Sequence, residues 1–208
     1  MNIVLVVLAA GGGTRFHGPT HKLLALLQGR PVVHHAIAHA MHSGAGPIIV
    51  VTGAVHLDLG DIDLGDIDVG DIDLGDPAAR VSVVSNERWS DGQASSLVRA
   101  LQAVDELHPE ADAVVVALGD QPFVSPRTWR AIAQAPPEHH IVVASYDGRR
   151  GPHPVRLHRS LWAALPRTGD DGARALIREH SAVVHEVPCT GTAADIDTLE
   201  DLQRWTSS

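Results

Sequence analysis

Residues 3–15 read I-V-L-V-V-L-A-A-G-G-G-T-R, and we expect this stretch to decide the fold. Its first six residues are all aliphatic, which is typical of a strand that is buried on both faces of a sheet. The chain then turns through three consecutive glycines and reaches Thr14 and Arg15. A buried strand that runs straight into a glycine-rich loop favours an α/β fold.

Beyond this loop, short apolar runs alternate with helical patterns. Strands are predicted at residues 3–8, 47–52, 81–84, 113–118 and 141–145, and helices at residues 31–43, 95–106 and 125–135. Alternating strands and helices favour a parallel sheet that is covered by helices. We therefore predict an α/β fold in one domain over residues 1–208, with three layers, a Rossmann-like first half and a mixed, mostly parallel sheet.

The last third of the chain is less regular. It predicts short strands at residues 154–157 and 183–187, a helical turn at 161–165, a helix at 172–179 and a final helix that ends at residue 205. Asp197 and Glu200 have the spacing of a capping box, which predicts that Asp197 caps the final helix.

Residues 57–76 interrupt the alternation with a five-residue unit that occurs four times, in forms such as I-D-L-G-D. A period of five keeps no constant face on a helix or a strand. We expect an acidic, solvated insertion within the domain. Aspartates at alternate positions leave a calcium or magnesium site as the alternative, although the twelve-residue EF-hand pattern is missing.

The composition indicates a globular protein with unevenly distributed charge. The formal net charge is −9, but eight aspartates lie in the acidic repeat, and the rest of the chain is close to neutral. A near-neutral surface does not favour nucleic-acid binding. No apolar run reaches the roughly 18 residues that span a bilayer, and the apolar start lacks a basic leader, so we expect neither membrane contact nor a signal peptide. Because Cys189 is the only cysteine, we expect a cytoplasmic location.

The glycine-rich loop has the composition of a phosphate-binding site. Glycines let the backbone approach a ligand closely, and their N–H groups can converge on phosphate oxygens. Arg15 offers a planar fork for phosphate, and Lys22 offers a mobile charge. The spacing G-G-G-T-R-x6-K matches neither the P-loop nor the dinucleotide-binding fingerprint, which would place a glycine at Phe16.

Two further motifs lie at the ends of predicted elements. Gly119-Asp120-Gln121-Pro122 follows a buried strand at the sheet edge where α/β proteins bind ligands. Asp120 there could hold Mg²⁺ while phosphate oxygens complete its coordination, the alternative being an ordinary aspartate in a turn. In G-Q-A-S-S-L at residues 92–97, Ser95 either caps the following helix or faces a ligand at the helix N-terminus.

These motifs together resemble one known family. They are L-A-A-G-G-G-T-R-F-x5-K-L-L from residue 8, G-Q-A-S-S-L from residue 92, G-D-Q-P from residue 119, G-P-H-P-V from residue 151, T-G-D-D-G-A-R from residue 168 and D-I-D-T-L-E-D-L from residue 195. The set resembles the MobA-like nucleotidyltransferases, and within them it is most similar to the molybdenum cofactor cytidylyltransferases. Only the acidic repeat lies outside the resemblance. Pro152 departs from a loop that often reads G-H-P or G-N-P in the family.

The resemblance implies a site and a reaction. Arg15, Lys22 and Asp120 would be the catalytic residues, and Asp120 and Asp195 would hold Mg²⁺. Asp197 lies where relatives place a second metal or substrate contact, which is the alternative to its role as a helix cap. The implied nucleotide-binding residues are Leu8, Ala9, Ala10, Gly11, Gly12, Gly13, Thr14, Ser95 and Ser96. The implied reaction transfers CMP or GMP from CTP or GTP to the phosphate of a molybdopterin-type cofactor and releases pyrophosphate. A molybdoenzyme is the implied protein partner.

Other functions stay open from the sequence alone. The transfer could serve another phosphorylated acceptor, such as phospholactate, phosphoenolpyruvate or a sugar 1-phosphate. A non-catalytic protein that binds a nucleotide and delivers a cofactor is a second alternative, although such a protein would not need Arg15, Lys22 and Asp120. A third alternative makes the acidic repeat the functional element. His35, His39 and His42 share one helical face, which we interpret as solvated or partner-facing in preference to a zinc or nickel site.

Overall fold

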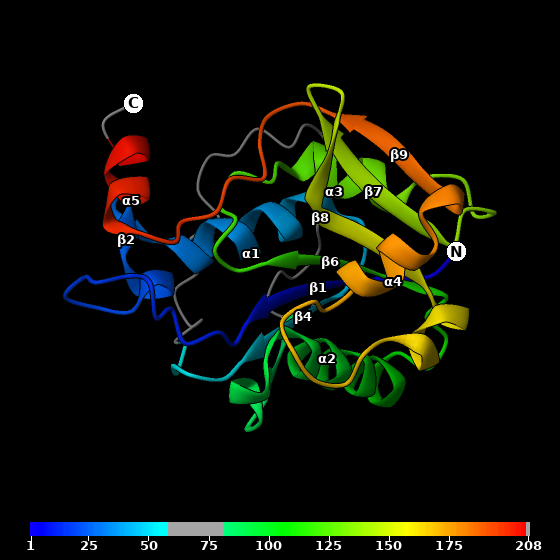
Figure 1. Ribbon diagram of the computed structural model, residues 1–208, viewed down its shortest axis with the longest axis horizontal. Helices are drawn as coiled ribbons and strands as arrows, with labels where there is room; N and C mark the ends of the chain where they lie inside the picture. The colour runs from blue at the N-terminus through cyan, green and yellow to red at the C-terminus, as the bar shows by residue number, and fades with distance from the viewer. Residues whose placement is uncertain (58–80, 207–208) are drawn as a thin grey trace.

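The computed structural model describes residues 1–57 and 81–206 of the chain, and its centre is a seven-stranded sheet. The strands stand in the order β5-β4-β1-β6-β8-β7-β9 (Figure 1). Their bounds are Ile3–Ala9 (β1), Ile48–Thr52 (β4), Val81–Ser85 (β5), Ala113–Leu118 (β6), Ile141–Tyr146 (β7), Arg149–His158 (β8) and Val184–Cys189 (β9). A separate antiparallel pair is formed by β2 (Leu26–Leu27) and β3 (Arg30–Pro31).

The sheet is mixed, because β8 runs antiparallel to both of its neighbours, while every other neighbouring pair is parallel. β8 begins five residues before the predicted strand at 154–157, since its first half forms a hairpin with β7. Asp147 and Gly148 make the turn with φ angles of 50° and 72°. Two central residues with positive φ are the geometry of a two-residue hairpin, for which Asp-Gly is a strong sequence signal.

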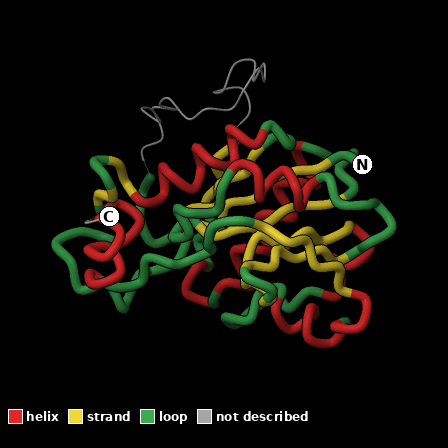
Figure 2. The backbone as a smooth tube through the Cα atoms, turned by 90° about the horizontal axis from the view of Figure 1, so that it is seen from above, coloured by secondary structure: helices red, strands yellow, loops and turns green. Residues whose placement is uncertain are grey.

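Helices cover both faces of the sheet (Figures 1 and 2). α1 (Val32–Ser43) and α3 (Pro126–Ala133) share one apolar core with Leu5, Val7 and Ala9 of β1. α2 (Gln93–Leu107) and α4 (Arg174–Glu179) share another core with the alternate residues of that strand. Because successive side chains point to opposite faces, one aliphatic run supplies both cores. The predicted three-layer α/β architecture with a mostly parallel sheet is confirmed.

The end of the chain differs from its prediction by one residue. The capping box of α5 (Leu199–Thr206) joins Thr198 and Asp201: the Thr198 hydroxyl accepts from the Asp201 N–H at 3.1 Å, and the Asp201 carboxylate accepts from the Thr198 N–H at 2.9 Å. The predicted capping by Asp197 is therefore wrong. Because Thr198 caps the helix, the Asp197 side chain does not, and it binds charged side chains instead.

A third apolar cluster fixes the segment before α5 against the carboxyl ends of the strands. Ile196 is fully buried there, and the rings of Phe123 and Trp205 lie 4.2 Å apart between their centres. The Ile196 N–H donates to the carbonyl oxygen of Asp120 at 2.9 Å. The two aspartates that flank Ile196 are thereby brought to the end of β6.

The histidine face of α1 is also corrected. His42 is buried with its Nδ1 2.6 Å from the Ala38 oxygen, and His35 lies half-buried with its Nε2 2.8 Å from the Leu27 oxygen. Burial, and secondarily the charges of His35 and His42, lower the pKa of His39 to about 4. These side chains are therefore packed into the protein. The prediction that they form a solvated face is wrong.

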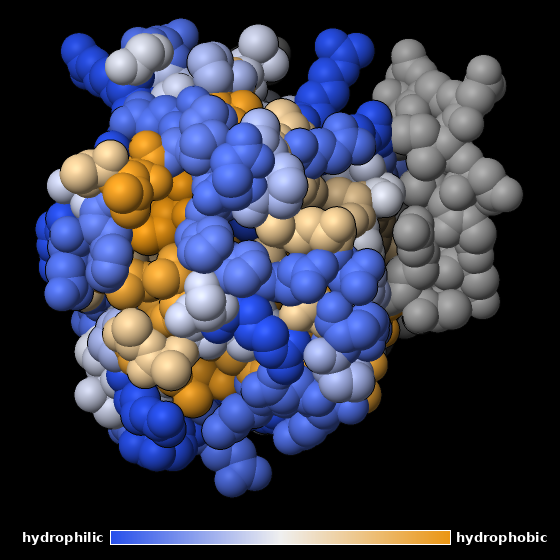
Figure 3. All heavy atoms as spheres, turned by 90° about the vertical axis from the view of Figure 1, so that its right-hand side faces the viewer, coloured by the Kyte–Doolittle hydropathy of each residue, from blue (hydrophilic) through white to orange (hydrophobic). Residues whose placement is uncertain are grey.

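Some predictions fall outside the part of the chain that the structure describes. Leu57, the first residue of the predicted insertion at 57–76, is buried in the core on the α1 side of the sheet, and the rest of that insertion lies outside the described residues. Within the described residues, no helix has the length and apolar composition needed to cross a membrane. Figure 3 shows the end of the molecule that carries the N-terminus, where hydrophilic side chains separate several apolar patches.

Candidate active site

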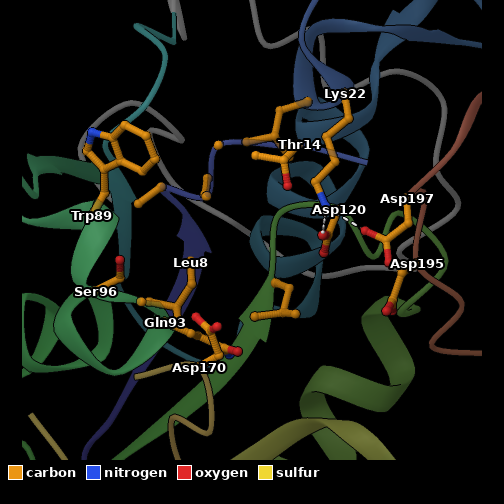
Figure 4. A pocket seen from close by; sticks show the side chains of 18 of the residues that line it. Leu8, Thr14, Lys22, Trp89, Gln93, Ser96, Asp120, Asp170, Asp195 and Asp197 are labelled. Atoms are coloured by element: carbon orange, nitrogen blue, oxygen red, sulfur yellow. Dashed lines mark hydrogen bonds and ion pairs between the residues drawn. The ribbon is translucent and has the colours of Figure 1, made fainter. Parts of the chain in front are cut away.

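A cavity of about 500 Å³ lies where β1 and β6 end, and the glycine-rich loop forms one of its walls. Its lining combines backbone, charged and apolar groups (Figure 4). The lining residues are Leu8, Ala9, Ala10, Gly11, Gly12, Gly13, Thr14, Arg15, Lys22, Leu23, Trp89, Ser90, Gly92, Gln93, Ser96, Leu118, Asp120, Asp170, Arg174, Asp195 and Asp197. This is the sheet edge at which parallel α/β folds bind ligands.

The loop from Gly11 to Gly13 needs glycine for two separate reasons. Gly13 has a φ of 61°, and a Cβ there would lie 2.9 Å from His21 Nε2. A Cβ on Gly12 would lie 2.9 Å from the Trp89 ring. His21 Nε2 in turn lies 3.1 Å from the Gly11 carbonyl oxygen, which ties the loop to the segment that carries Lys22. The loop is therefore held by its neighbours, with its backbone open to the cavity.

Lys22 is the centre of the charged wall. Its Nζ lies 2.5 Å from Asp120 Oδ2 and 2.7 Å from Asp197 Oδ1, and all three side chains are largely buried. Burial alone would lower the pKa of Lys22, but the charges and hydrogen bonds of the two aspartates outweigh it and raise the pKa. The exposed Arg15 guanidinium binds the other oxygen of Asp197 at 2.8 Å. Two cations and a carboxylate pair thus form one network beside the glycine loop.

Asp195 is held by a neutral partner. The Gln121 side-chain amide donates to Asp195 Oδ1 at 2.8 Å and to the Ala193 carbonyl at 3.2 Å, while its oxygen accepts from the Leu118 N–H. Burial raises the pKa of Asp195, and the charges of Asp120 and Asp197 add to this effect. A carboxylate that is costly to ionise in isolation is suited to a site that gains a cation.

The carboxylates fit a divalent cation that a phosphate also helps to hold. Asp120 Oδ1 is buried and has no hydrogen-bond partner, so one oxygen of this side chain is unsatisfied. Within the described residues, no three His, Cys, Asp or Glu side chains come together as a group that could hold a metal ion by themselves. Mg²⁺ typically uses one or two carboxylates and takes its other ligands from water and substrate phosphate. Asp120 and Asp195 meet that requirement.

The opposite side of the cavity is built by the start of α2 and the T-G-D-D loop. Gly92, with a φ of 98°, lets this loop approach, since a Cβ there would lie 2.5 Å from the Gly169 carbonyl oxygen. The Ala94 N–H donates to that same oxygen at 2.9 Å. Figure 4 shows Gln93, Ser96, Trp89 and Asp170 on this side, across from Lys22 and its carboxylates.

The structure brings the sequence-predicted residues together with one exception. The cavity is lined by all of the predicted loop residues, by the predicted catalytic residues, and by Ser96 and Asp195. Ser95 is not among the lining residues, because its hydroxyl donates to the Arg88 and Gly92 carbonyls and accepts from the Asn86 amide. Ser95 therefore stabilises the turn before α2 and does not face the cavity.

Sequence reasoning missed several lining residues. Trp89 lines the cavity although no quoted motif includes it, and Gln93, Asp170 and Arg174 lie in motifs that were quoted without a role for them. The motif T-G-D-D-G-A-R was the available signal for this wall of the cavity. Its glycines lie between polar residues, a composition that permits a tight turn. Asp197 was assigned to a helix cap in preference to a metal or substrate contact, because its spacing suited the cap.

This geometry defines an α/β protein whose glycine loop, basic side chains and carboxylates suit a nucleotide with its metal ion. A family model, the MobA-like NTP transferase domain, matches residues 5–184. The chain belongs to this family, and the predicted resemblance to the MobA-like nucleotidyltransferases is confirmed.

The chain is similar to longer proteins and to solved structures of its own length. It is 37% identical over 201 residues to the bifunctional protein GlmU of Roseobacter denitrificans, covering 92% of this chain but 40% of that protein. Rv0371c of Mycobacterium tuberculosis H37Rv is 29% identical with a TM-score of 0.74, covering 100% of this chain and 99% of that one. Rv0371c has also been solved in complex with manganese. The nucleotidyl transferase Mth528 of Methanothermobacter thermautotroptrophicus shares the fold, at 24% identity and a TM-score of 0.73 over 99% of this chain and 96% of that one.

Proposed function

We propose that this protein is a nucleotidyltransferase, which moves a nucleoside monophosphate from an NTP to the phosphate of a small acceptor and releases pyrophosphate. The observation that carries the proposal is the Lys22–Asp120–Asp197 network, which lies in the same cavity as the open glycine loop. Cations, carboxylates and free backbone amides in one cavity suit a metal-bound triphosphate. The family assignment supports the same reaction class.

The chain's own residues would bind and orient the nucleotide. The glycine loop, Arg15 and Lys22 line the cavity, where backbone N–H groups would bind the phosphates and the two cations would neutralise them. Asp120 and Asp195 would hold Mg²⁺, and the manganese complex of Rv0371c supports the use of a divalent ion. The metal would supply Lewis-acid stabilisation of charge on the phosphate oxygens.

The proposed reaction needs no strong general base. An oxygen of the acceptor phosphate attacks the α-phosphorus, forming a new P–O bond. The bond from the α-phosphorus to the bridging oxygen breaks, and pyrophosphate leaves with that electron pair. Because a phosphate monoester is already a nucleophile, catalysis rests on positioning and on charge stabilisation by Lys22 and Arg15.

The acceptor is proposed to be a molybdopterin-type cofactor, with CTP or GTP as donor. The motifs G-D-Q-P and T-G-D-D-G-A-R support this choice, since they are shared with the molybdenum cofactor cytidylyltransferases. Arg174 also lines the cavity and offers a guanidinium for a second anionic group. A sugar 1-phosphate is the second candidate, which the similarity to GlmU favours.

Pyrophosphate release tests the proposal. The protein is incubated with Mg²⁺ and with CTP, GTP, ATP or UTP in turn, together with molybdopterin, a sugar 1-phosphate or no acceptor. We expect acceptor-dependent release with one donor and with molybdopterin. If pyrophosphate is released only with the sugar phosphate, the acceptor is a sugar phosphate and not molybdopterin. If no pyrophosphate is released with any pair of donor and acceptor, the proposed reaction class is wrong.

A further inference from the structure

Lys22 binds the carboxylate that the proposed function assigns to a metal ion. Its Nζ touches Asp120 Oδ2 and Asp197 Oδ1 at the same time, and Figure 4 shows the ammonium group pointing between the two carboxylates. Asp120 Oδ1 is left buried without a partner. One oxygen of Asp120 is therefore already neutralised by the positive charge of Lys22.

A second cation at this position would meet two obstacles. It would lie beside the ammonium group of Lys22, and like charges in a partly buried site repel strongly. It would also compete with Lys22 for Asp120, whose hydrogen bond to a charged donor is among the stronger kinds. Asp120 Oδ1 is the oxygen left for a metal ion, so the ion and the ammonium group would have to share one carboxylate at close range.

A triphosphate removes both obstacles. It brings several negative charges to the glycine loop, beside which Lys22 and Arg15 already stand. A lysine side chain is a flexible four-carbon stem, so its ammonium group can exchange a carboxylate for a phosphate by rotation. Arg15, whose side chain is 75% exposed, is also free to turn toward the phosphates.

We propose that Lys22 acts as an exchangeable counter-ion, which occupies Asp120 in the free protein and yields it to the divalent cation when a triphosphate arrives. This inference rests on the proposed function. It means that the metal ion and the nucleotide bind cooperatively, since each favours the state in which Lys22 has left Asp120. Such coupling is reciprocal by thermodynamic necessity.

Mn²⁺ binding without nucleotide tests this inference, because it needs no turnover. Free Mn²⁺ is titrated into the wild-type protein and into Lys22→Met and Lys22→Gln, and the bound fraction is read by electron paramagnetic resonance. Removing the competing charge is expected to raise the affinity for Mn²⁺ alone by about tenfold or more, although both variants should lose turnover. The two variants carry neutral side chains of different shape, so a folding defect in one need not occur in the other. Circular dichroism shows whether each variant is folded.

Two control variants separate local exchange from a general change in charge. Arg15→Met removes one positive charge from the same network but leaves Asp120 bound to Lys22, so its Mn²⁺ affinity should rise much less. Adding Asp120→Asn to Lys22→Met should abolish the gain in Mn²⁺ affinity, because the carboxylate that Lys22 no longer binds is then missing. A Lys22 variant that binds Mn²⁺ no better than the wild type, or an equal gain in Arg15→Met, would overturn the exchange.

The outcome is independent of the reaction class. A protein that turns over CTP but gains no Mn²⁺ affinity in the Lys22 variants is a nucleotidyltransferase without the exchange. A protein that gains Mn²⁺ affinity but releases no pyrophosphate with any donor has the exchange, while its assigned reaction is wrong.

Discussion

At the scale of single residues, Asp120 is the side chain on which the proposed chemistry depends most. Its one oxygen is bound by Lys22 and its other is buried without a partner. Asp120→Asn keeps the shape but removes the charge that would hold a metal ion. We expect turnover to fall by about 100-fold or more, because the variant loses the carboxylate that would hold the metal ion against the charge of the transition state. The melting temperature should change little.

Turnover of Asp120→Asn is compared with that of Asp147→Asn, measured as pyrophosphate release. Asp147 is exposed and lies in the β7–β8 turn, where asparagine accepts the same positive φ. The control should stay fully active. Near-normal turnover in Asp120→Asn would show that the metal ligand has been misassigned.

Gln121 acts one step from the site, through Asp195. Replacing Gln121 by Glu keeps the acceptor for the Leu118 N–H but sets a carboxylate against Asp195 where an amide had donated. We expect activity to fall by about 10- to 100-fold, which is typical when a partner of a metal ligand is lost. The same change at the exposed Gln134 is the matched control. An apparent Mg²⁺ affinity equal to that of the control would contradict a positioning role.

At the scale of elements, the capping box of α5 determines where the segment 195–197 stands. Thr198→Ala removes the hydroxyl that accepts from the Asp201 N–H. We expect a loss of about 1 kcal/mol in unfolding free energy, as for other helix caps, together with a raised KM for the NTP, because Asp197 is the neighbouring residue and binds Lys22. Thr206→Ala, at the other end of the same helix, should lower stability without changing KM.

The difference between predictable and unpredictable features also appears at this scale. β1 was predictable because its aliphatic run is long enough to serve both faces of the sheet. The cap of α5 was not, since Asp197 and Thr198 are both good caps and only the tertiary contact with Lys22 distinguishes them. Arg156 was equally hidden: it is fully buried, and its guanidinium donates to four backbone carbonyls from residues 133 to 139. Contacts between distant segments leave no local pattern in a sequence.

At the scale of the whole molecule, the site is an assembly of separate segments around one sheet edge. The glycine loop follows β1, Asp120 follows β6, and Asp195 and Asp197 arrive from the segment that the third apolar cluster anchors. The sequence motifs named most of these residues but not their contacts. Their convergence follows from the parallel pairing of β1 with both β4 and β6, which sets the carboxyl ends of these strands side by side.

The packing of both sheet faces makes the fold sensitive to acid. Burial, and secondarily Arg174, lowers the pKa of His153 to about 3, and burial lowers that of His39 to about 4. The unfolded chain therefore binds more protons than the folded protein as the pH falls below the ordinary histidine value of about 6.5. The contribution of these two histidines to the free energy of unfolding is fully present above that pH. Below it, each contribution falls by about 1.4 kcal/mol per pH unit. The raised pKa of Asp195 acts in the opposite direction above the ordinary value of 3.8 and offsets part of the loss.

Urea unfolding at pH 7.5, 6.0 and 5.0 measures this dependence. His39→Gln should reduce the slope of stability against pH over that interval, since one imidazole with a strongly lowered pKa is then absent. His56→Gln changes an exposed histidine and should leave the slope unaltered. A wild-type stability that does not change from pH 7.5 to 5.0 would show that these imidazoles are protonated as easily in the folded protein as in water. The packing of α1 against the sheet would then have to be looser than the buried core around His39 indicates.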